Sequence, residues 1–330
     1  MLTPGPEALG ARRLGRSPVF VTELSFGGAP IGNMAAEVSD DEARATVDAA
    51  WDGGIRTFDT APFYGAGLSE RRLGAALRHR PRDEYVLSTK VGRVLEPASA
   101  GQGPSGHPVA GGPVAGGPVP RFDFSGDGVR RSLAASLDRL GLDRVDIALI
   151  HDPDDHGEQA FREAYPAMER LRAQGVVRAI GVGMNQAAML TRFVVDTDVD
   201  LVLVAGRYTL LDQSAATSLL PAAQRRGVAV LAAGVFNSGV LAAPVPGASY
   251  DYAAAPPSVL ARARALEQAC ARFGVPLRAA AARFPLAHPA VASVLIGARS
   301  AAEITDAIRL RRLPIPAALW ESLPGGRWEY

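Results

Sequence analysis

Short runs of consecutive apolar residues recur along the chain, and between them apolar positions repeat every three or four residues. The runs lie at 24–27, 55–59, 85–90, 145–150, 176–182, 201–204, 228–232 and 291–296. Unbroken apolar runs of this length are typical of strands in a parallel sheet that helices cover. Eight such units in one chain predict an α/β fold, namely a (β/α)8 barrel of the TIM type.

The ends of the periodic stretches carry helix signals. Ser39 and Glu42 form a capping box that predicts a helix through Trp51, and Ser69 is expected to cap a helix through Arg78. Further helices are predicted up to Leu140, at 158–174, 186–196, 214–226 and 258–273, and from Ser300. A doubly wound sheet is the alternative, but it would usually carry a glycine-rich fingerprint that this chain shows only in fragments.

Two segments fall outside the alternating pattern. The first 25 residues predict a short N-terminal β-hairpin that turns at 14–18. Residues 97–120 are rich in Gly and Pro, and Pro-Val-Ala-Gly-Gly occurs at 108–112 and again at 113–117. This composition predicts a flexible loop inserted after the third strand, which either covers a substrate or is a neutral insertion. We expect residues 1–330 to form a single barrel domain around it.

Composition and charge narrow the function. The chain has 330 residues, is 48% hydrophobic and carries a formal net charge of +1, which excludes a largely disordered chain and argues against nucleic-acid or membrane partners. Cys270 is the one cysteine, and no apolar run approaches the roughly 18 residues of a membrane span. We therefore expect a cytoplasmic protein, a monomer or small homo-oligomer, that acts on a small molecule.

Polar residues close three consecutive strands. Asp59 ends the second, Lys90 the third and His151 the fourth, and Tyr64 follows Asp59 in a short loop. Lys90 is the one lysine among 35 basic residues. Parallel strands of a barrel end at one face, so these four side chains are expected to converge. An ammonium beside a phenol favours the phenolate, which predicts a tuned proton donor and acceptor.

Three strings carry a family resemblance, namely Gly-Gly-Ile-Arg-Thr-Phe-Asp-Thr-Ala-Pro-Phe-Tyr-Gly at 53–65, Leu-Ser-Thr-Lys-Val-Gly at 87–92 and Leu-Ile-His-Asp-Pro at 149–153. Together they resemble the aldo-keto reductase family, a barrel that binds NAD(P)H without a Rossmann fold. The resemblance implies a catalytic tetrad of Asp59, Tyr64, Lys90 and His151, with the tyrosine as general acid and base.

The resemblance also implies cofactor contacts after strands seven and eight. The first loop offers Gly234, Phe236 and Ser238, and the second offers Gly297, Arg299 and Ser300. Ser300 at a helix start suits an anion. Glu303 would repel a 2′-phosphate while Arg299 would attract one, so between NAD and NADP the sequence leans slightly to NAD, and no metal is expected.

Several positions depart from the family pattern. Gly183 and Met184 stand where a Ser-Asn pair is usual, and alanines occupy three other cofactor positions, namely 205, 233 and 307. Asn185, with Arg207 or Tyr208, is expected to replace the missing contacts.

The strings 151–156, 183–186, 206–212 and 234–239 resemble the sugar and pyridoxal dehydrogenases within the family. This resemblance implies oxidation of the anomeric hydroxyl of an aldose such as L-fucose to a lactone, with pyridoxal 4-dehydrogenation or general aldehyde and ketone reduction as alternatives. Asp152, Asp154, Asp155 and His156 would then meet sugar hydroxyls, unless the acidic cluster caps the helix that follows. A metal-dependent barrel hydrolase and a non-catalytic nicotinamide-binding regulator are the remaining alternatives.

Overall fold

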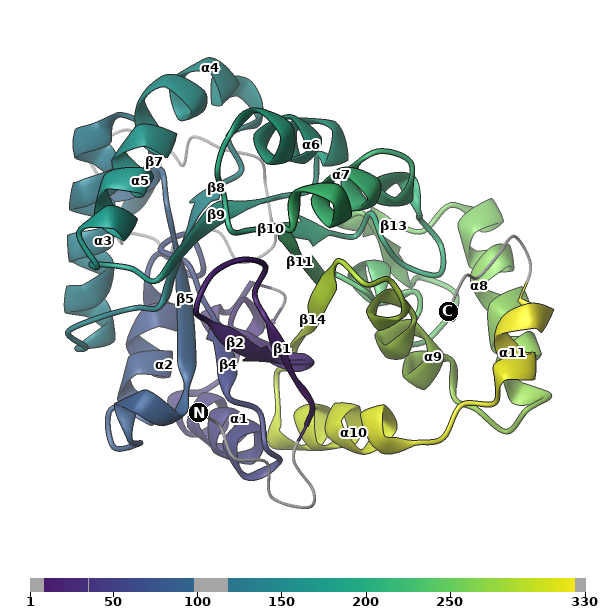
Figure 1. The fold of residues 1–330 in the computed structure, drawn as a ribbon. Coiled ribbons are helices and arrows are strands. Elements are labelled where there is room, and N and C mark those ends of the chain that lie inside the picture. The colour runs from purple at the N-terminus through teal and green to yellow at the C-terminus, as the bar shows by residue number, and fades with distance from the viewer. Residues whose placement is uncertain (1–8, 35, 98–117, 324–330) are drawn as a thin grey trace.

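The computed structural model describes residues 9–34, 36–97 and 118–323, in which parallel strands close into a barrel in chain order (Figure 1). This confirms the predicted (β/α)8 architecture. The barrel strands are β3 (Leu24–Gly27), β4 (Thr57–Asp59), β5 (Val86–Val91), β8 (Ile147–His151), β9 (Ala179–Met184), β10 (Leu201–Ala205), β11 (Ala229–Ala233) and β14 (Val291–Gly297).

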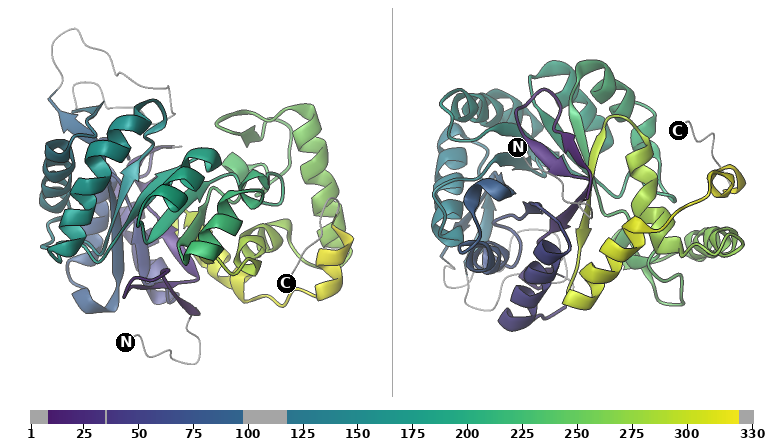
Figure 2. Two further views of the ribbon diagram at one scale, coloured as in Figure 1. Left: turned by 45° about the horizontal axis from the view of Figure 1, so that its top comes forward. Right: turned by 60° about the horizontal axis from the view of Figure 1, so that its bottom comes forward.

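Helices surround the barrel, as the views of Figure 2 show. They are α1 (Asp40–Asp52), α2 (Leu68–Leu77), α3 (Gly126–Leu140), α4 (Gly157–Gln159), α5 (Tyr165–Ala173), α6 (Ala187–Asp196), α7 (Leu219–Arg226), α8 (Pro257–Ala271), α9 (Leu277–Arg283), α10 (Ala301–Arg312) and α11 (Ala317–Ser322). Shorter helical turns are η1 (Pro30–Gly32), η2 (Arg82–Glu84), η3 (Asp154–His156), η4 (Ala160–Ala164), η5 (Ser214–Ala216), η6 (Asn237–Gly239) and η7 (Phe284–Ala287). None of the helices described here has the length and apolar character that a membrane crossing demands.

In the described part of the chain, three hairpins accompany the barrel. The predicted N-terminal hairpin is present as β1 (Ala11–Arg13) and β2 (Phe20–Thr22). Neither β6 (Arg93–Glu96) with β7 (Val119–Phe122) nor β12 (Ser249–Tyr250) with β13 (Ala253–Ala254) was expected from the sequence. Residues 98–117 of the predicted loop at 97–120 lie outside the described residues, while 119 and 120 belong to β7.

Local signals explain most helix boundaries. The Ser39 hydroxyl accepts a hydrogen bond from Glu42 N at 3.2 Å, as the capping box predicts. The expected cap at Ser69 is wrong, because α2 begins at Leu68 and its N-cap is Gly67, two residues earlier, whose φ of 84° favours glycine. Ser69 instead lies buried and donates to Gly28 O at 2.7 Å, so its hydroxyl fastens α2 to the end of β3.

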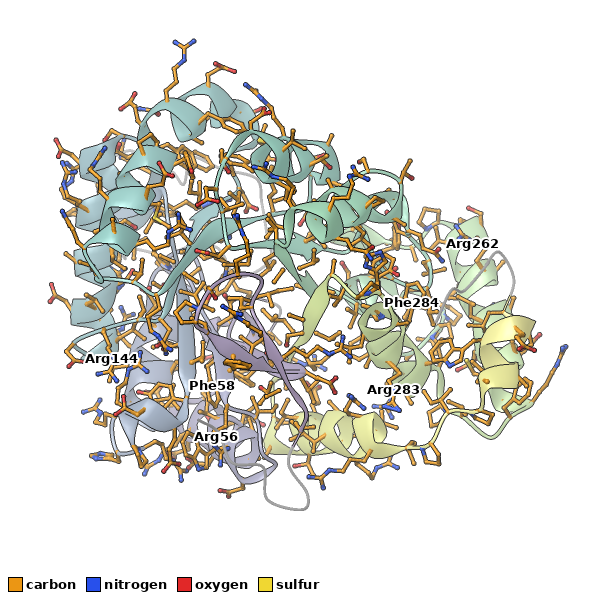
Figure 3. The ribbon with its side chains drawn as sticks, in the orientation of Figure 1. Arg56, Phe58, Arg144, Arg262, Arg283 and Phe284 are labelled. Carbon is orange, nitrogen blue, oxygen red and sulfur yellow. The ribbon has the colours of Figure 1, made fainter. Side chains whose placement is uncertain are left out.

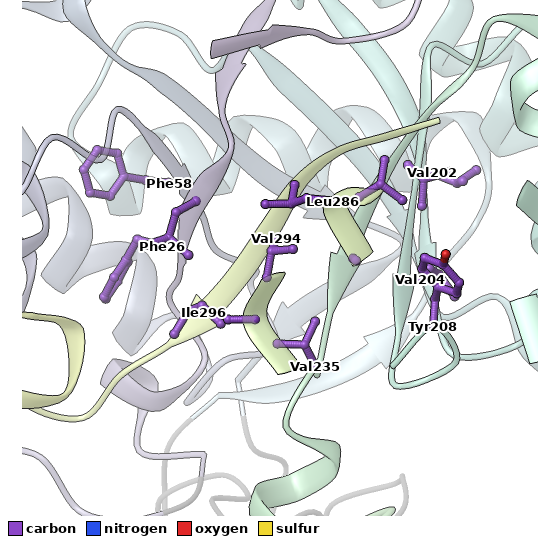
Figure 4. Packing of buried hydrophobic residues seen from close by; sticks show 14 of the residues in the cluster. Phe26, Phe58, Val202, Val204, Tyr208, Val235, Leu286, Val294 and Ile296 are labelled. Atoms are coloured by element: carbon purple, nitrogen blue, oxygen red, sulfur yellow. The ribbon is translucent and has the colours of Figure 1, made fainter. Parts of the chain in front are cut away.

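Two apolar clusters hold the barrel together. The outer one lies between strands and helices, and Figure 4 shows part of it, including Phe26 on β3, Phe58 on β4 and Val202 on β10. Phe58 stacks on Trp51 of α1, and the Arg56 guanidinium carbon lies 3.9 Å from the Trp51 ring centre (Figure 3). These contacts pack α1 against β4.

The inner cluster fills the amino-terminal end of the barrel. Leu14, Val19 and Val21 of the β1–β2 hairpin pack there against side chains such as Leu149 and Leu203 from the strands. Because the hairpin covers this end, the opposite end, where the strands reach their carboxyl termini, is left for a ligand site.

A buried ion pair ties together elements near that end. Glu70 on α2 is fully buried, and its carboxylate accepts hydrogen bonds from Thr89 Oγ1 of β5 at 2.7 Å and from Arg139 Nε of α3 at 2.6 Å. A buried carboxylate with both oxygens bonded in this way holds two helices and one strand in a fixed relation.

Candidate active site

Lys90 lies at the centre of a hydrogen-bonded cluster at the carboxyl ends of the strands. Its Nζ donates to Asp59 Oδ2 at 2.6 Å, to Thr60 O at 3.0 Å and to Tyr64 Oη at 3.1 Å. Ser88 Oγ donates to the other oxygen of Asp59 at 2.6 Å. The Lys90 ammonium therefore has three oxygen partners, although the residue is only 1% exposed.

Burial and charge act in opposite directions on Lys90 and Tyr64. Burial is the largest effect on Lys90 and lowers its pKa, but the Asp59 carboxylate and Tyr64 outweigh it, so the net pKa is raised. Burial is also the largest effect on Tyr64 and raises its pKa to about 12, although the Lys90 ammonium pulls that pKa down. Lys90 is thus the group that favours a phenolate at Tyr64.

His151 completes the cluster from the end of β8. Its ring meets the Tyr64 ring edge-on, with centres 5.8 Å apart. Burial, together with the charges of Arg93 and Lys90, lowers the His151 pKa well below its ordinary value. The imidazole is therefore neutral, and its buried Nδ1 has no hydrogen-bond partner among the described residues. A neutral imidazole can orient a substrate oxygen through Nε2.

An ion pair that the sequence did not reveal lies beside His151. Arg93 Nη2 donates to Asp152 Oδ2 at 2.7 Å, and this oxygen is 3.4 Å from His151 Nε2. The Arg93 guanidinium carbon lies 4.1 Å from the ring centre of Phe63 and 4.8 Å from that of Phe122. Burial raises the pKa of Asp152, while Arg93 lowers it.

The other predicted substrate residues lie further out. Asp154 and Asp155 are exposed in η3, and His156 packs on Phe122 with ring centres 4.9 Å apart. The capping alternative for this acidic cluster is wrong, because neither η3 nor α4 has a side-chain cap.

The predicted loop after β11 carries three of the residues expected to contact a cofactor. Gly234 is exposed with a φ of 61°, and Ser238 Oγ accepts from Tyr252 N at 3.1 Å, while Phe236 is partly buried. The Tyr252 side chain lies near Asn185, which follows β9, and near Asp152, since both act on its pKa. No sequence signal indicated this placement.

The predicted loop after β14 carries a pair of opposite charges. Ser300 caps α10 by accepting from Glu303 N at 3.3 Å. Arg299 Nη2 donates to Glu303 Oε1 at 2.6 Å, and Arg299 N donates to Oε2 at 2.8 Å. This mutual bonding lowers the pKa of Glu303, although burial opposes it. The two residues whose opposite charges favoured different cofactors therefore bind each other.

The two expected replacement contacts have protein partners. Tyr208 is buried and packs on Phe284, with ring centres 4.9 Å apart. Arg207 Nη1 bonds Asp251 at 2.9 Å and Asp212 at 3.2 Å, which fastens the β12–β13 hairpin to the segment after β10.

The loops after β11 and β14 suit an extended anionic ligand. Gly234 and Gly297 are exposed there, and a Cβ on Gly297 would lie 2.8 Å from the Pro30 ring. Asn237 Oδ1 is buried without a hydrogen-bond partner, and the first N–H groups of α10 face the loop at Ser300. In the described ranges, no group of three or more His, Cys, Asp or Glu residues is arranged to hold a metal ion.

Comparison with known proteins defines the class. Residues 23–323 match the model of the aldo/keto reductase family. The chain therefore belongs to this family and is an NAD(P)-dependent oxidoreductase, which leaves no support for the metal-dependent hydrolase alternative.

Individual relatives refine the position within the family. D-threo-aldose 1-dehydrogenase of Pseudomonas sp. is 45% identical over 93% of this chain and 94% of its own length. Pyridoxal 4-dehydrogenase of Microbacterium luteolum is 41% identical over 94% and 96%. Aldo-keto reductase AKR11C1 from Bacillus halodurans is a solved structure with a TM-score of 0.76 and 25% identity, covering 96% of this chain and 95% of its own. The chain thus resembles the branch that its sequence indicated.

Proposed function

We propose that the protein oxidises the anomeric C1 hydroxyl of an aldose, such as L-fucose, to the corresponding lactone with NAD(P). The observation that carries this proposal is the 3.1 Å contact between Tyr64 Oη and Lys90 Nζ, with Lys90 held by Asp59. The similarity to a D-threo-aldose 1-dehydrogenase over nearly the whole chain supports the substrate class.

In this mechanism Tyr64 is the general base. Its oxygen, as phenolate, takes the proton of the C1 hydroxyl, and the charge of Lys90 stabilises that phenolate before the transfer. His151 donates from Nε2 to the same substrate oxygen and fixes its orientation, since burial keeps the imidazole neutral. A nicotinamide cofactor, when bound, would supply the acceptor for the hydride of C1. In the reverse direction, neutral Tyr64 protonates the carbonyl oxygen.

Residues in the loops after β11 and β14 fit the cofactor. We assign the pyrophosphate to the loop with Gly234 and Ser238, the carboxamide to Asn185, and the adenosine end to Gly297 and the start of α10 at Ser300. Phe236 lines the first of these loops from its partly buried position.

We propose NAD as the preferred cofactor. Glu303 occupies the guanidinium of Arg299, which is the group that would bind a 2′-phosphate, and adds a negative charge of its own. Both effects disfavour NADP.

Pyridoxal 4-dehydrogenation is the second candidate. Phe63 and Phe122 flank Arg93 beside His151, and aromatic walls of this kind suit a pyridine ring. The 41% identity to a pyridoxal 4-dehydrogenase also supports pyridoxal as a substrate. General reduction of aldehydes and ketones needs only the Tyr64 cluster.

The test compares wild type with Tyr64→Phe on L-fucose, other aldoses, pyridoxal and simple aldehydes, each with NAD(H) and NADP(H). We expect L-fucose oxidation in the wild type and a loss of about a hundred- to ten-thousand-fold in kcat in the variant. Cofactor binding, followed by fluorescence titration, should stay unchanged. Tyr165→Phe is the matched control, since the half-buried Tyr165 hydroxyl bonds Glu169 and Asp198 N, away from Lys90 and His151.

The outcomes separate the candidates. Turnover of pyridoxal but not of aldoses would replace the proposed substrate. Tight cofactor binding without turnover of any substrate would favour the non-catalytic regulator. Normal turnover by Tyr64→Phe would remove the general-base role.

A further inference from the structure

The Arg93–Asp152 ion pair has no part in the proton transfer described above, yet it adjoins the reacting position. Asp152 Oδ2 lies 2.7 Å from Arg93 Nη2 and 3.4 Å from His151 Nε2. Because His151 orients the reacting oxygen in the proposed function, the ion pair begins one group away from that oxygen. A ligand bound at Tyr64 and His151 therefore presents its next polar substituent to this pair.

Arg93 is held rigidly and has donors to spare. It lies between the rings of Phe63 and Phe122, and its side chain is 14% exposed. Nε is buried without a partner, and within the described part of the chain Nη2 makes the one hydrogen bond found for this guanidinium. Arginine carries five N–H donors, so the majority are left for a ligand or for water.

Asp152 is held by its backbone as well as by its side chain. Its φ is 43°, a conformation that costs energy for any residue but glycine and that aspartate tolerates better than most. Asp152 N donates to Gly183 O of β9 at 3.0 Å, which fixes the backbone. A strained residue with its carboxylate fixed beside the reacting position is typical of a ligand contact.

We infer that Arg93 and Asp152 together bind a hydroxyl group on the carbon next to the reacting carbon, so that the site selects vicinal diols and 2-hydroxyaldehydes. A hydroxyl both donates and accepts hydrogen bonds, and this pair offers an acceptor and a donor side by side. The inference rests on the proposed role of Tyr64 and His151. It identifies the hydroxyl on the neighbouring carbon as the substituent that the site recognises. Arg93 and Asp152 are then specificity-determining residues for a polyhydroxylated substrate.

The test uses two small aldehydes that differ by one hydroxyl group, lactaldehyde and propionaldehyde, in the direction of reduction. We expect the wild type to prefer lactaldehyde in kcat/KM by about a hundred-fold, as charge-assisted hydrogen bonds to one hydroxyl allow. Arg93→Met and Asp152→Asn should each reduce this ratio at least ten-fold, with the larger loss on lactaldehyde. Asparagine keeps the shape of Asp152 and also tolerates the positive φ.

Arg121→Met is the matched control. Arg121 forms an ion pair with Glu96 on the same β6–β7 hairpin, but it is adjacent to Phe122 in the strand and so faces the opposite side. This variant should keep the wild-type ratio.

Two results would overturn the inference. One is a wild type that does not distinguish the two aldehydes, and the other is an equal loss on both in the Arg93 and Asp152 variants, which would show a structural role. Failure of the proposed function gives a different pattern, because the lactaldehyde preference would persist while no aldose is oxidised.

Discussion

Replacing Lys90 by methionine tests how strongly its charge tunes Tyr64. The Nζ–Oη distance is 3.1 Å, and two unit charges at that distance attract by about 5 kcal/mol at an effective dielectric constant of about 20. That energy equals about four pKa units. Without the ammonium, the pKa of Tyr64 is therefore expected to rise by about three to four units.

A higher pKa at Tyr64 reduces the phenolate at every working pH. We therefore expect Lys90→Met to oxidise substrate about a thousand-fold more slowly than wild type at each pH below about 10, where Tyr64 is mostly protonated in both proteins. The assay follows absorbance of the reduced nicotinamide over a series of pH values. Lys90→Arg keeps the charge and should recover part of the rate.

The reasoning would be refuted by a methionine variant that oxidises substrate at the wild-type rate, or by an arginine variant that is no faster than the methionine variant. Cofactor titration by fluorescence and urea unfolding check that the variant is folded and binds. A methionine variant that binds cofactor normally but is slow, and is partly rescued by arginine, supports the electrostatic role.

Three further predictions concern cofactor choice and stability. Glu303→Gln should free Arg299 and raise the ratio of kcat/KM for NADP over NAD several-fold, about 1 kcal/mol; an unchanged ratio removes the reason for preferring NAD. Glu70→Ala should lower the free energy of unfolding in urea by about 3 kcal/mol, whereas Asp127→Ala, at an exposed ion pair, should change it by less than about 0.5 kcal/mol. Folded Tyr64 keeps its proton to about pH 12 while the unfolded phenol loses it near pH 10, so stability should fall as pH rises above about 10, and less so in Tyr64→Phe.

Much of the fold followed from the sequence, because the barrel strands are mostly apolar runs that are largely buried. The boundaries followed less closely. The helix predicted at 214–226 is regular only from Leu219, and β4 begins at Thr57 rather than at residue 55. Ser69 failed as a cap because its hydroxyl bonds a strand carbonyl in the folded chain, and such a tertiary contact leaves no local signal.

The residues of the candidate site were also only partly predictable from the sequence. Asp59, Lys90 and His151 were predictable because charged or polar groups at buried strand ends are costly without partners. Arg93 and Tyr252 were missed because each depends on a hairpin that brings distant residues together. Arg93 is one of many arginines in the sequence, so its residue type gives no signal. Tyr252 lies in a turn whose two central residues have positive φ, a conformation that a tyrosine does not predict.

The solitary lysine also makes the chain a reporter of its own unfolding. A protease that cleaves after lysine has a single cleavage site in the 330 residues, at Lys90. This residue lies on β5 of the barrel and is 1% exposed. The rate of cleavage into two fragments would therefore report how often the barrel unfolds. A ligand that binds the folded barrel should lower this rate in proportion to its affinity.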